Sequence, residues 1–175
     1  WFREDRRNIL TTLGTIPIIY GVSSDKVPPV NVGITKNQGY ELLLSWEDQI
    51  GNWRYSLSGD VSYSRNKIVY KAEAENPYPW MNQTGFSIGQ RFGLVSDGFF
   101  NTNEELAYNP YPANRATLGD IRYVDLNGDG LIDNKDIAPI GYPNYPEYHF
   151  NVKASVGWKG FDLRVLFIGT ANGSY

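Results

Sequence analysis

Apolar and polar residues alternate along one stretch of the sequence, from Trp53 to Asn66, with almost no exceptions. One series of positions holds Trp53, Tyr55, Leu57, Gly59, Val61 and Tyr63. The positions between them hold polar residues, most of them serines. Because a β-strand points successive side chains to opposite faces, this period of two predicts a strand with one apolar and one polar face.

Three further stretches alternate in the same way, from Tyr40 to Trp46, from His149 to Trp158 and from Phe161 onwards. The short segments Gln49 to Asn52 and Trp158 to Gly160 connect these stretches in pairs, and both have the length of hairpin connections. We therefore predict four antiparallel strands, at about 39–48, 53–68, 147–157 and 161–169.

Aromatic residues gather beside both predicted turns, with Trp46 and Trp53 at one and Trp158 and Phe161 at the other. Strands of about ten residues, apolar on one face and bordered by aromatic residues, are typical of outer-membrane β-barrels. A soluble antiparallel sandwich has strands that alternate in the same way. The pattern predicts an all-β fold and leaves barrel and sandwich open.

The composition excludes several classes of protein. Of the 175 residues 41% are apolar and 15% aromatic, which argues against disorder. The net charge is −3 and there is no basic stripe, so nucleic acid is not an expected partner. Without cysteine there is no disulfide, thiol nucleophile or thiolate metal site. No stretch approaches the roughly 18 apolar residues of a membrane helix.

Between the two predicted hairpins lies a long excursion, at about 69–146, rich in Gly, Pro, Asn and Tyr. Outer-membrane barrels have short periplasmic turns and long outer loops, so a barrel would place this excursion outside the cell. Its length indicates a functional loop, whereas a sandwich would carry it as a very large insertion. Its three Tyr/Pro clusters, at 76–79, 109–112 and 142–146, either contact a sugar or peptide ligand or are stiff loops that pack on themselves.

The stretch DLNGDGLIDNKD, from Asp125 to Asp136, has the spacing of a calcium loop. Gly130 stands where such a loop turns sharply. The predicted ligands are side-chain oxygens at alternate positions and one backbone carbonyl, from Asp125, Asn127, Asp129, Leu131, Asp133 and Asp136. The predicted cofactor is a structural Ca²⁺ ion.

Two features of this loop argue against a calcium switch. Asp136 is shorter than the bidentate Glu of sensor loops. The flanking segments look extended, and Pro139 blocks a helix there, so the helix pair of a sensor is missing. A static calcium clip on an exterior loop is one interpretation, and a turn whose carboxylates hydrogen-bond the backbone is the other.

No catalytic constellation appears in the sequence, and we do not expect an enzyme. His149 is the only histidine and falls on the polar face of a predicted strand, where it is expected to line a wall or lumen rather than act as a base. Phosphate loops, dinucleotide fingerprints and zinc-protease motifs are all missing. The Asp residues of the loop are too close together for a glycosidase pair.

Three segments, 119–169, 31–46 and 92–100, strongly resemble the C-terminal part of SusC/RagA-type TonB-dependent outer-membrane transporters. The segments begin with GDIRYVDLNGDG, NVGITKNQGYEL and FGLVSDGFF, and they occur in the right order across most of the chain. This resemblance implies a barrel on the order of 22 strands with an N-terminal plug, energised through TonB. It also implies a SusD-like surface lipoprotein as partner and import of glycans or peptides.

We therefore expect residues 1–175 to be a portion of such a barrel in the bacterial outer membrane, in contact with lipid, with the region that contacts TonB lying outside this sequence. Four strands do not close a barrel, so the isolated portion should be an open antiparallel sheet. The alternative is a soluble, secreted β-sandwich binding module with a structural calcium site.

Overall fold

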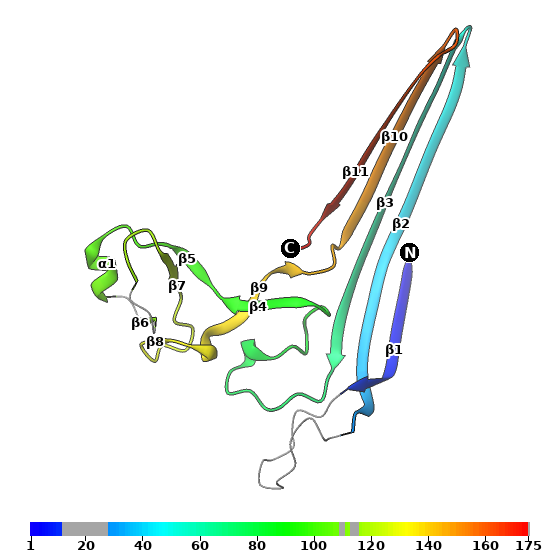
Figure 1. Ribbon diagram of the computed structural model, residues 1–175. Coiled ribbons are helices and arrows are strands. Elements are labelled where there is room, and N and C mark those ends of the chain that lie inside the picture. The colour runs from blue at the N-terminus through cyan, green and yellow to red at the C-terminus, as the bar shows by residue number, and fades with distance from the viewer. Residues whose placement is uncertain (12–27, 109–110, 113–115, 175) are drawn as a thin grey trace.

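The computed structural model describes residues 1–11, 28–108, 111–112 and 116–174. Its main feature is a five-stranded sheet in the order β1-β2-β3-β10-β11, in which every neighbouring pair is antiparallel (Figure 1). The strands are β1 (Phe2–Thr11), β2 (Val30–Ile50), β3 (Trp53–Tyr70), β10 (Tyr148–Trp158) and β11 (Phe161–Ala171). The predicted all-β, open antiparallel sheet is thus confirmed.

Two tight turns close the hairpins, and their residues explain why the chain reverses there. Gly51 follows β2 with a φ of 59°, in the left-handed region that a two-residue hairpin turn requires at its first position. Lys159 and Gly160 between β10 and β11 both have positive φ, 44° and 90°, as in a type I′ turn. Both turns lie at the same end of the sheet (Figure 1).

The two hairpins lie side by side although a long segment of sequence separates them. β3 pairs with β10 from Trp53, opposite Trp158, to Tyr63, opposite Tyr148. The same residues of β3 pair on their other side with β2, so β3 is a central strand.

Strand β1 was not among the predicted strands. It pairs with the first part of β2, from Phe2 opposite Gly39 to Thr11 opposite Val30, and β2 accordingly begins well before position 39. The run from Arg3 to Arg7 is charged or polar throughout, so no apolar alternation marks it. Backbone pairing with β2, rather than a buried face, defines this strand.

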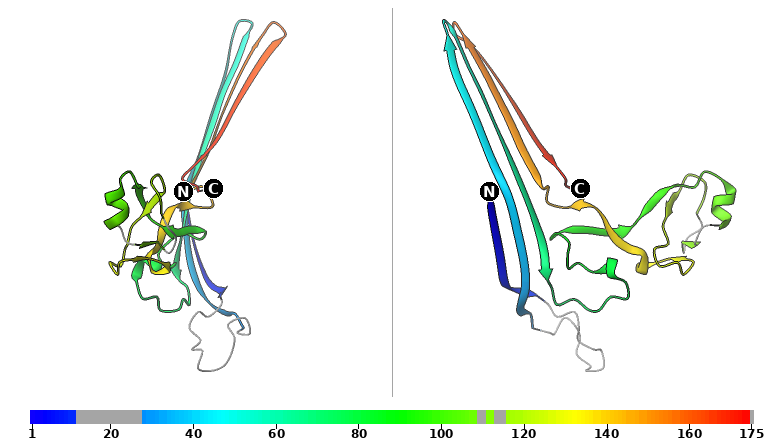
Figure 2. Two further views of the ribbon diagram at one scale, coloured as in Figure 1. Left: turned by 60° about the vertical axis from the view of Figure 1, so that its left-hand side comes forward. Right: turned by 180° about the vertical axis from the view of Figure 1, so that it is seen from behind.

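The excursion between β3 and β10 leaves the sheet at the end opposite to the hairpin turns and projects to one side (Figure 1 and Figure 2). Its strands pair as β4 with β9, β5 with β7, and β6 with β8. In chain order the elements are a 3₁₀ turn (Pro79–Met81), β4 (Gln90–Leu94), β5 (Ser96–Phe99), α1 (Asn103–Tyr108), β6 (Tyr111–Pro112), β7 (Ile121–Tyr123), β8 (Leu131–Ile132), a second 3₁₀ turn (Asn134–Asp136) and β9 (Ile137–Pro143).

The buried apolar side chains of the described residues lie in the excursion and in the chain that enters it. They are Ala72, Phe100, Ile132 and Ala138. The large apolar residues of the main sheet are instead exposed, and no second sheet covers them in the described part of the chain. The described residues therefore do not form a sandwich.

Candidate functional site

The register of the main sheet arranges its apolar side chains in rows across the strands. One row contains Leu42, Val61 and Phe150, and the next contains Leu44 and Val152 with Gly59 between them. The exposed fraction of the side chain reaches 65% at Leu44 and 57% at Trp46. A contiguous apolar surface of this kind requires a cover, either lipid or protein.

Aromatic residues border this apolar face at both ends. At the hairpin turns, the rings of Trp53 and Trp158 stack with their centroids 5.5 Å apart. At the other end, Tyr63 lies between Tyr40 and Tyr148, with centroid distances of 5.4 and 4.7 Å. We call these borders the Trp row and the Tyr row.

The spacing of the two rows fits a lipid bilayer. Tyr63 is ten positions along the chain from Trp53, and Trp158 is ten positions from Tyr148. At about 3.3 Å per residue this is roughly 33 Å along the strand, and a strand tilt of about 40° gives a height of roughly 25 Å. This matches the apolar band of about 25 Å that is usual in outer-membrane barrels.

The opposite face of the sheet is mainly polar. The hydroxyl oxygens of Ser56 and Ser155 are 2.7 Å apart, and the Asn151 side-chain amide donates to Asp60. His149 also lies on this face, opposite Ser62 on β3. Two exposed apolar residues of β11, Leu166 and Ile168, depart from the pattern. A face of this composition suits contact with water or with polar protein surface.

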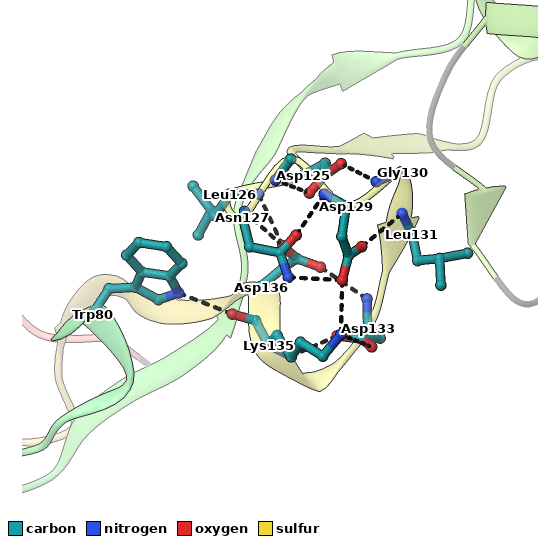
Figure 3. A network of polar contacts seen from close by, with 11 residues as sticks. Trp80, Asp125, Leu126, Asn127, Asp129, Gly130, Leu131, Asp133, Lys135 and Asp136 are labelled. Carbon is teal, nitrogen blue, oxygen red and sulfur yellow. Dashed lines mark hydrogen bonds and ion pairs between the residues drawn. The ribbon is translucent and has the colours of Figure 1, made fainter. Parts of the chain in front are cut away.

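The loop from Asp125 to Asp136 is held by hydrogen bonds from its own backbone (Figure 3). The Asp125 carboxylate accepts from the amides of Gly128 and Gly130, at 2.7 and 2.8 Å. The carboxylate of Asp136, which is fully buried, accepts from the amides of Leu126 and Asp133, both at 2.9 Å. A third amide, that of Asn127, lies 3.4 Å from Asp136.

A lysine supplies the positive charge among these acids. The Lys135 ammonium lies 2.7 Å from Asp129 Oδ2 and 3.7 Å from Asp133 Oδ2. The hydrogen bond from Lys135 lowers the pKa of Asp129, and the same bond raises the pKa of Lys135. Sequence reasoning missed this role, although the lysine stands between the last two acids of the motif.

An indole ties the loop to the segment that follows β3 (Figure 3). Trp80 Nε1 donates to the backbone carbonyl of Lys135 at 2.9 Å. The Trp80 ring stacks on Tyr78, with centroids 4.7 Å apart and an angle of 8° between the planes. Trp80 therefore links Tyr78, of the Tyr/Pro cluster at 76–79, to the loop. The cluster at 109–112 lies partly outside the described residues.

The predicted calcium ligands are not arranged as a cage. Side chains of Asp125, Asn127, Asp129, Asp133 and Asp136 accept from backbone amides, and Leu131 N donates to Asp129. In the part of the chain that the structure describes, no group of three or more His, Asp or Glu side chains is placed to hold a metal ion. As folded, the residues fit a hydrogen-bonded turn better than a calcium site, and calcium binding stays a prediction.

No helix of the described residues has both the length and the apolar character needed to cross a membrane. No family model matches the chain. A TonB-dependent receptor of Formosa agariphila is 25% identical over 153 residues, which cover 80% of this chain and 15% of the receptor.

Solved structures of the RagAB peptide importer match nearly the whole chain. In the closed-closed state the TM-score is 0.64 at 17% identity, over 98% of this chain and 18% of the matched chain. In the open-open state the TM-score is 0.58 at 18% identity, over the same shares of the two chains. The resemblance to SusC/RagA-type TonB-dependent transporters is confirmed.

The chain spans less than a fifth of the proteins that it matches. The two-faced sheet with its lateral excursion has the fold of a part of the RagAB importer. The chain is thus similar in sequence to a part of a TonB-dependent receptor and in fold to a part of the RagAB importer.

Proposed function

We propose that the chain forms part of the barrel wall of an active transporter in the bacterial outer membrane. The observation that carries this proposal is the apolar face between the Trp row and the Tyr row, whose height of roughly 25 Å matches an outer-membrane barrel. In this proposal the apolar face contacts lipid and the polar face, with His149, faces the lumen or a plug. The role is transport rather than catalysis.

The excursion between β3 and β10 leaves the sheet beyond the Tyr row. Because long loops of outer-membrane barrels are extracellular and short turns periplasmic, we place the excursion outside the cell and the two hairpin turns in the periplasm. The loop from Asp125 to Asp136 belongs to this excursion and is held by its own hydrogen bonds. A loop of fixed shape at this position is suited to contact a surface partner. We propose a SusD-like lipoprotein as that partner.

The cargo that we propose is a glycan or a peptide, energised through TonB by parts of the transporter outside this chain. The RagAB system, whose solved structures share this fold, is a peptide importer, which supports the peptide alternative. The competing function, a soluble secreted β-sandwich module, receives no support from an apolar sheet face on which large residues such as Leu42, Leu44 and Phe167 are exposed.

Fluorescence quenching in bilayers tests the proposal on the whole protein that contains this chain. Lipids brominated near the headgroup should quench Trp46, Trp53 and Trp158 in a variant in which the remaining tryptophans are replaced. A matched variant that keeps only Trp80, in the excursion, should not be quenched. If the protein stays in solution without detergent and lipid quenches neither variant, the membrane assignment is wrong.

A further inference from the structure

The pairing of β2 and β3 continues past the Tyr row, on the side away from the hairpin turns. Between the turns and the Tyr row this face of the sheet is apolar, and beyond the row it becomes basic. Two residues beyond Tyr63, Arg65 pairs with Gln38, and two residues farther Lys67 pairs with Lys36. Side chains two and four positions beyond Tyr63 point to the same side as its ring. The apolar face and these basic side chains are therefore continuous.

Lys36 and Lys67 stand directly opposite each other, and both are exposed. Like charges at directly opposed positions of an antiparallel pair destabilise it. Among the described residues, neither lysine has an ion pair with a carboxylate. The opposed pair therefore has an uncompensated positive charge.

Two acidic residues beside this pair, Asp5 and Glu147, already form ion pairs. Asp5 faces Lys36 from β1, but its carboxylate pairs with Arg3 at 3.5 Å. Glu147, which is buried, pairs with Arg65 at 3.2 Å. Arginines thus pair with both acids, and neither lysine forms an ion pair with either acid.

A cavity of about 720 Å³ adjoins the pair. Lys36, Arg65 and Lys67 line it from the sheet, and Tyr142 and Asn172 are among the residues that line it from the other side. Glu147, which pairs with Arg65, also lines the cavity, so the two cationic side chains of this lining without an ion pair are Lys36 and Lys67. A cavity of this volume has room for an anionic group larger than a single phosphate.

The backbone of the pair lies just beyond the headgroup layer, within reach of a lysine side chain. Lys67 is four residues beyond Tyr63, about 13 Å along the strand and about 10 Å in height at the usual tilt. The polar layer on each side of a bilayer is roughly 5–8 Å deep. A lysine stem extends far enough for its ammonium to enter that layer.

We propose that Lys36 and Lys67 together bind the phosphate of an anionic lipid headgroup in the outer leaflet. This inference rests on the proposed placement of the apolar face in the membrane. Compact ammonium groups bind phosphate as point charges, and basic clusters beside a membrane-spanning segment attract anionic lipids. The lipid phosphate relieves the repulsion between the lysines and fixes the height of the sheet in the bilayer.

Lipid titration of the whole transporter in detergent tests this proposal, with phosphatidylglycerol as the anionic probe and phosphatidylcholine as the zwitterionic one. Phosphatidylglycerol should raise the thermal midpoint, and phosphatidylcholine should not. In the double variant Lys36→Gln and Lys67→Gln, the affinity for phosphatidylglycerol should fall about 30-fold at low salt, because each basic residue near an anionic surface contributes about fivefold.

Lys153→Gln is the matched control, since Lys153 lies on the polar face of β10 and its removal changes the net charge without touching the pair. This variant should keep the wild-type affinity. Equal affinity in the double variant and the wild type would overturn the proposal. Inorganic phosphate that reproduces the midpoint shift alone would overturn the lipid assignment. A wild-type protein that fails to enter vesicles would instead contradict the proposed membrane function.

Discussion

The ring of Phe150 on β10 lies against Gly169, the residue directly opposite it on β11. A Cβ atom at position 169 would come 2.7 Å from Phe150 Cε2, closer than atoms of this kind approach in folded proteins. The ring thus covers a glycine on the neighbouring strand and fills the gap that the missing side chain leaves.

We expect Gly169→Ala to lower the free energy of unfolding of the whole protein by about 1–3 kcal/mol, because the ring must leave its place. Gly59→Ala is the matched control on the same face. Its Cβ would meet Asn151 O at 3.5 Å and Val152 Cγ2 at 3.8 Å, which are ordinary contacts. Urea unfolding in detergent measures both variants, and equal losses would show that the ring contact contributes nothing.

Of the side chains in the loop from Asp125 to Asp136, that of Asp136 should be the one whose removal destabilises the loop most. Its buried carboxylate accepts from the amides of Leu126, Asn127 and Asp133. Asp136→Ala leaves these donors without their acceptor, and each unsatisfied buried group costs about 1–3 kcal/mol. The loop should then open to protease at 125–136 without unfolding of the main sheet.

Asp133→Ala is the comparison for this loss, because Asp133 is more exposed and its side chain accepts from Lys135 N as a cap of the 3₁₀ turn. Loss of such a cap costs about 1 kcal/mol. Limited proteolysis followed by mass spectrometry measures both variants. If Asp133→Ala opens the loop as readily as Asp136→Ala, the buried carboxylate is not its main support.

Four strands of the main sheet could be predicted from the sequence because the pattern that indicates each of them lies within a short stretch of the chain. The alternation in β3 and β10 lies in consecutive residues, and the hairpin turns lie directly beside it. Strand β1 carries no such signal, since Arg3 to Arg7 lack apolar partners and the strand is defined by its pairing with β2. The pairing of β3 with β10, which joins the hairpins, also spans too much sequence for a local pattern to specify.

The loop from Asp125 to Asp136 shows a second limit of prediction from sequence. Its spacing predicted which side chains carry oxygen ligands, but not which donors those oxygens meet in the fold. Lys135 competes for Asp129 and Asp133, and the Trp80 indole reaches the Lys135 carbonyl from 55 residues away. A long-range contact of this kind leaves no trace in the spacing.

Calcium titration should distinguish the two interpretations of this loop. A calcium clip predicts that millimolar calcium raises the thermal midpoint relative to chelator, that Asp129→Ala removes the rise, and that Lys135→Gln enlarges it by removing a competing cation. A turn held only by its own hydrogen bonds and by Lys135 predicts instead a midpoint that calcium leaves unchanged and that Lys135→Gln lowers equally with calcium or chelator. Lys153→Gln, an exposed lysine on β10 outside the loop, controls for charge.

Glu73 should make the stability of the excursion depend on pH. Its carboxylate accepts from the amides of Gln83 and Thr84, at 2.7 and 2.6 Å, and from the Thr84 hydroxyl. Burial raises the pKa of Glu73, but these hydrogen bonds and the charge of Lys71 outweigh it, and the pKa is lowered. The carboxylate therefore stabilises the folded state fully above the unfolded-state value of about 4.3, and this contribution is lost as the pH falls through the lower folded-state pKa.

Glu73→Gln should accordingly lower the free energy of unfolding by about 1 kcal/mol at pH 7, since an amide accepts these hydrogen bonds less strongly than a carboxylate. The difference between wild type and variant should begin to shrink as the pH falls below the unfolded-state value of about 4.3. It should disappear once the pH is below the lowered folded-state pKa, where the wild-type carboxylate is protonated as well. Thermal midpoints of both proteins from pH 7 to pH 3 measure this difference. Glu75→Gln, at an exposed position two residues away, should show no difference at any pH. If the difference in thermal midpoint between wild type and Glu73→Gln stays constant from pH 7 to pH 3, the negative charge of Glu73 does not stabilise this segment.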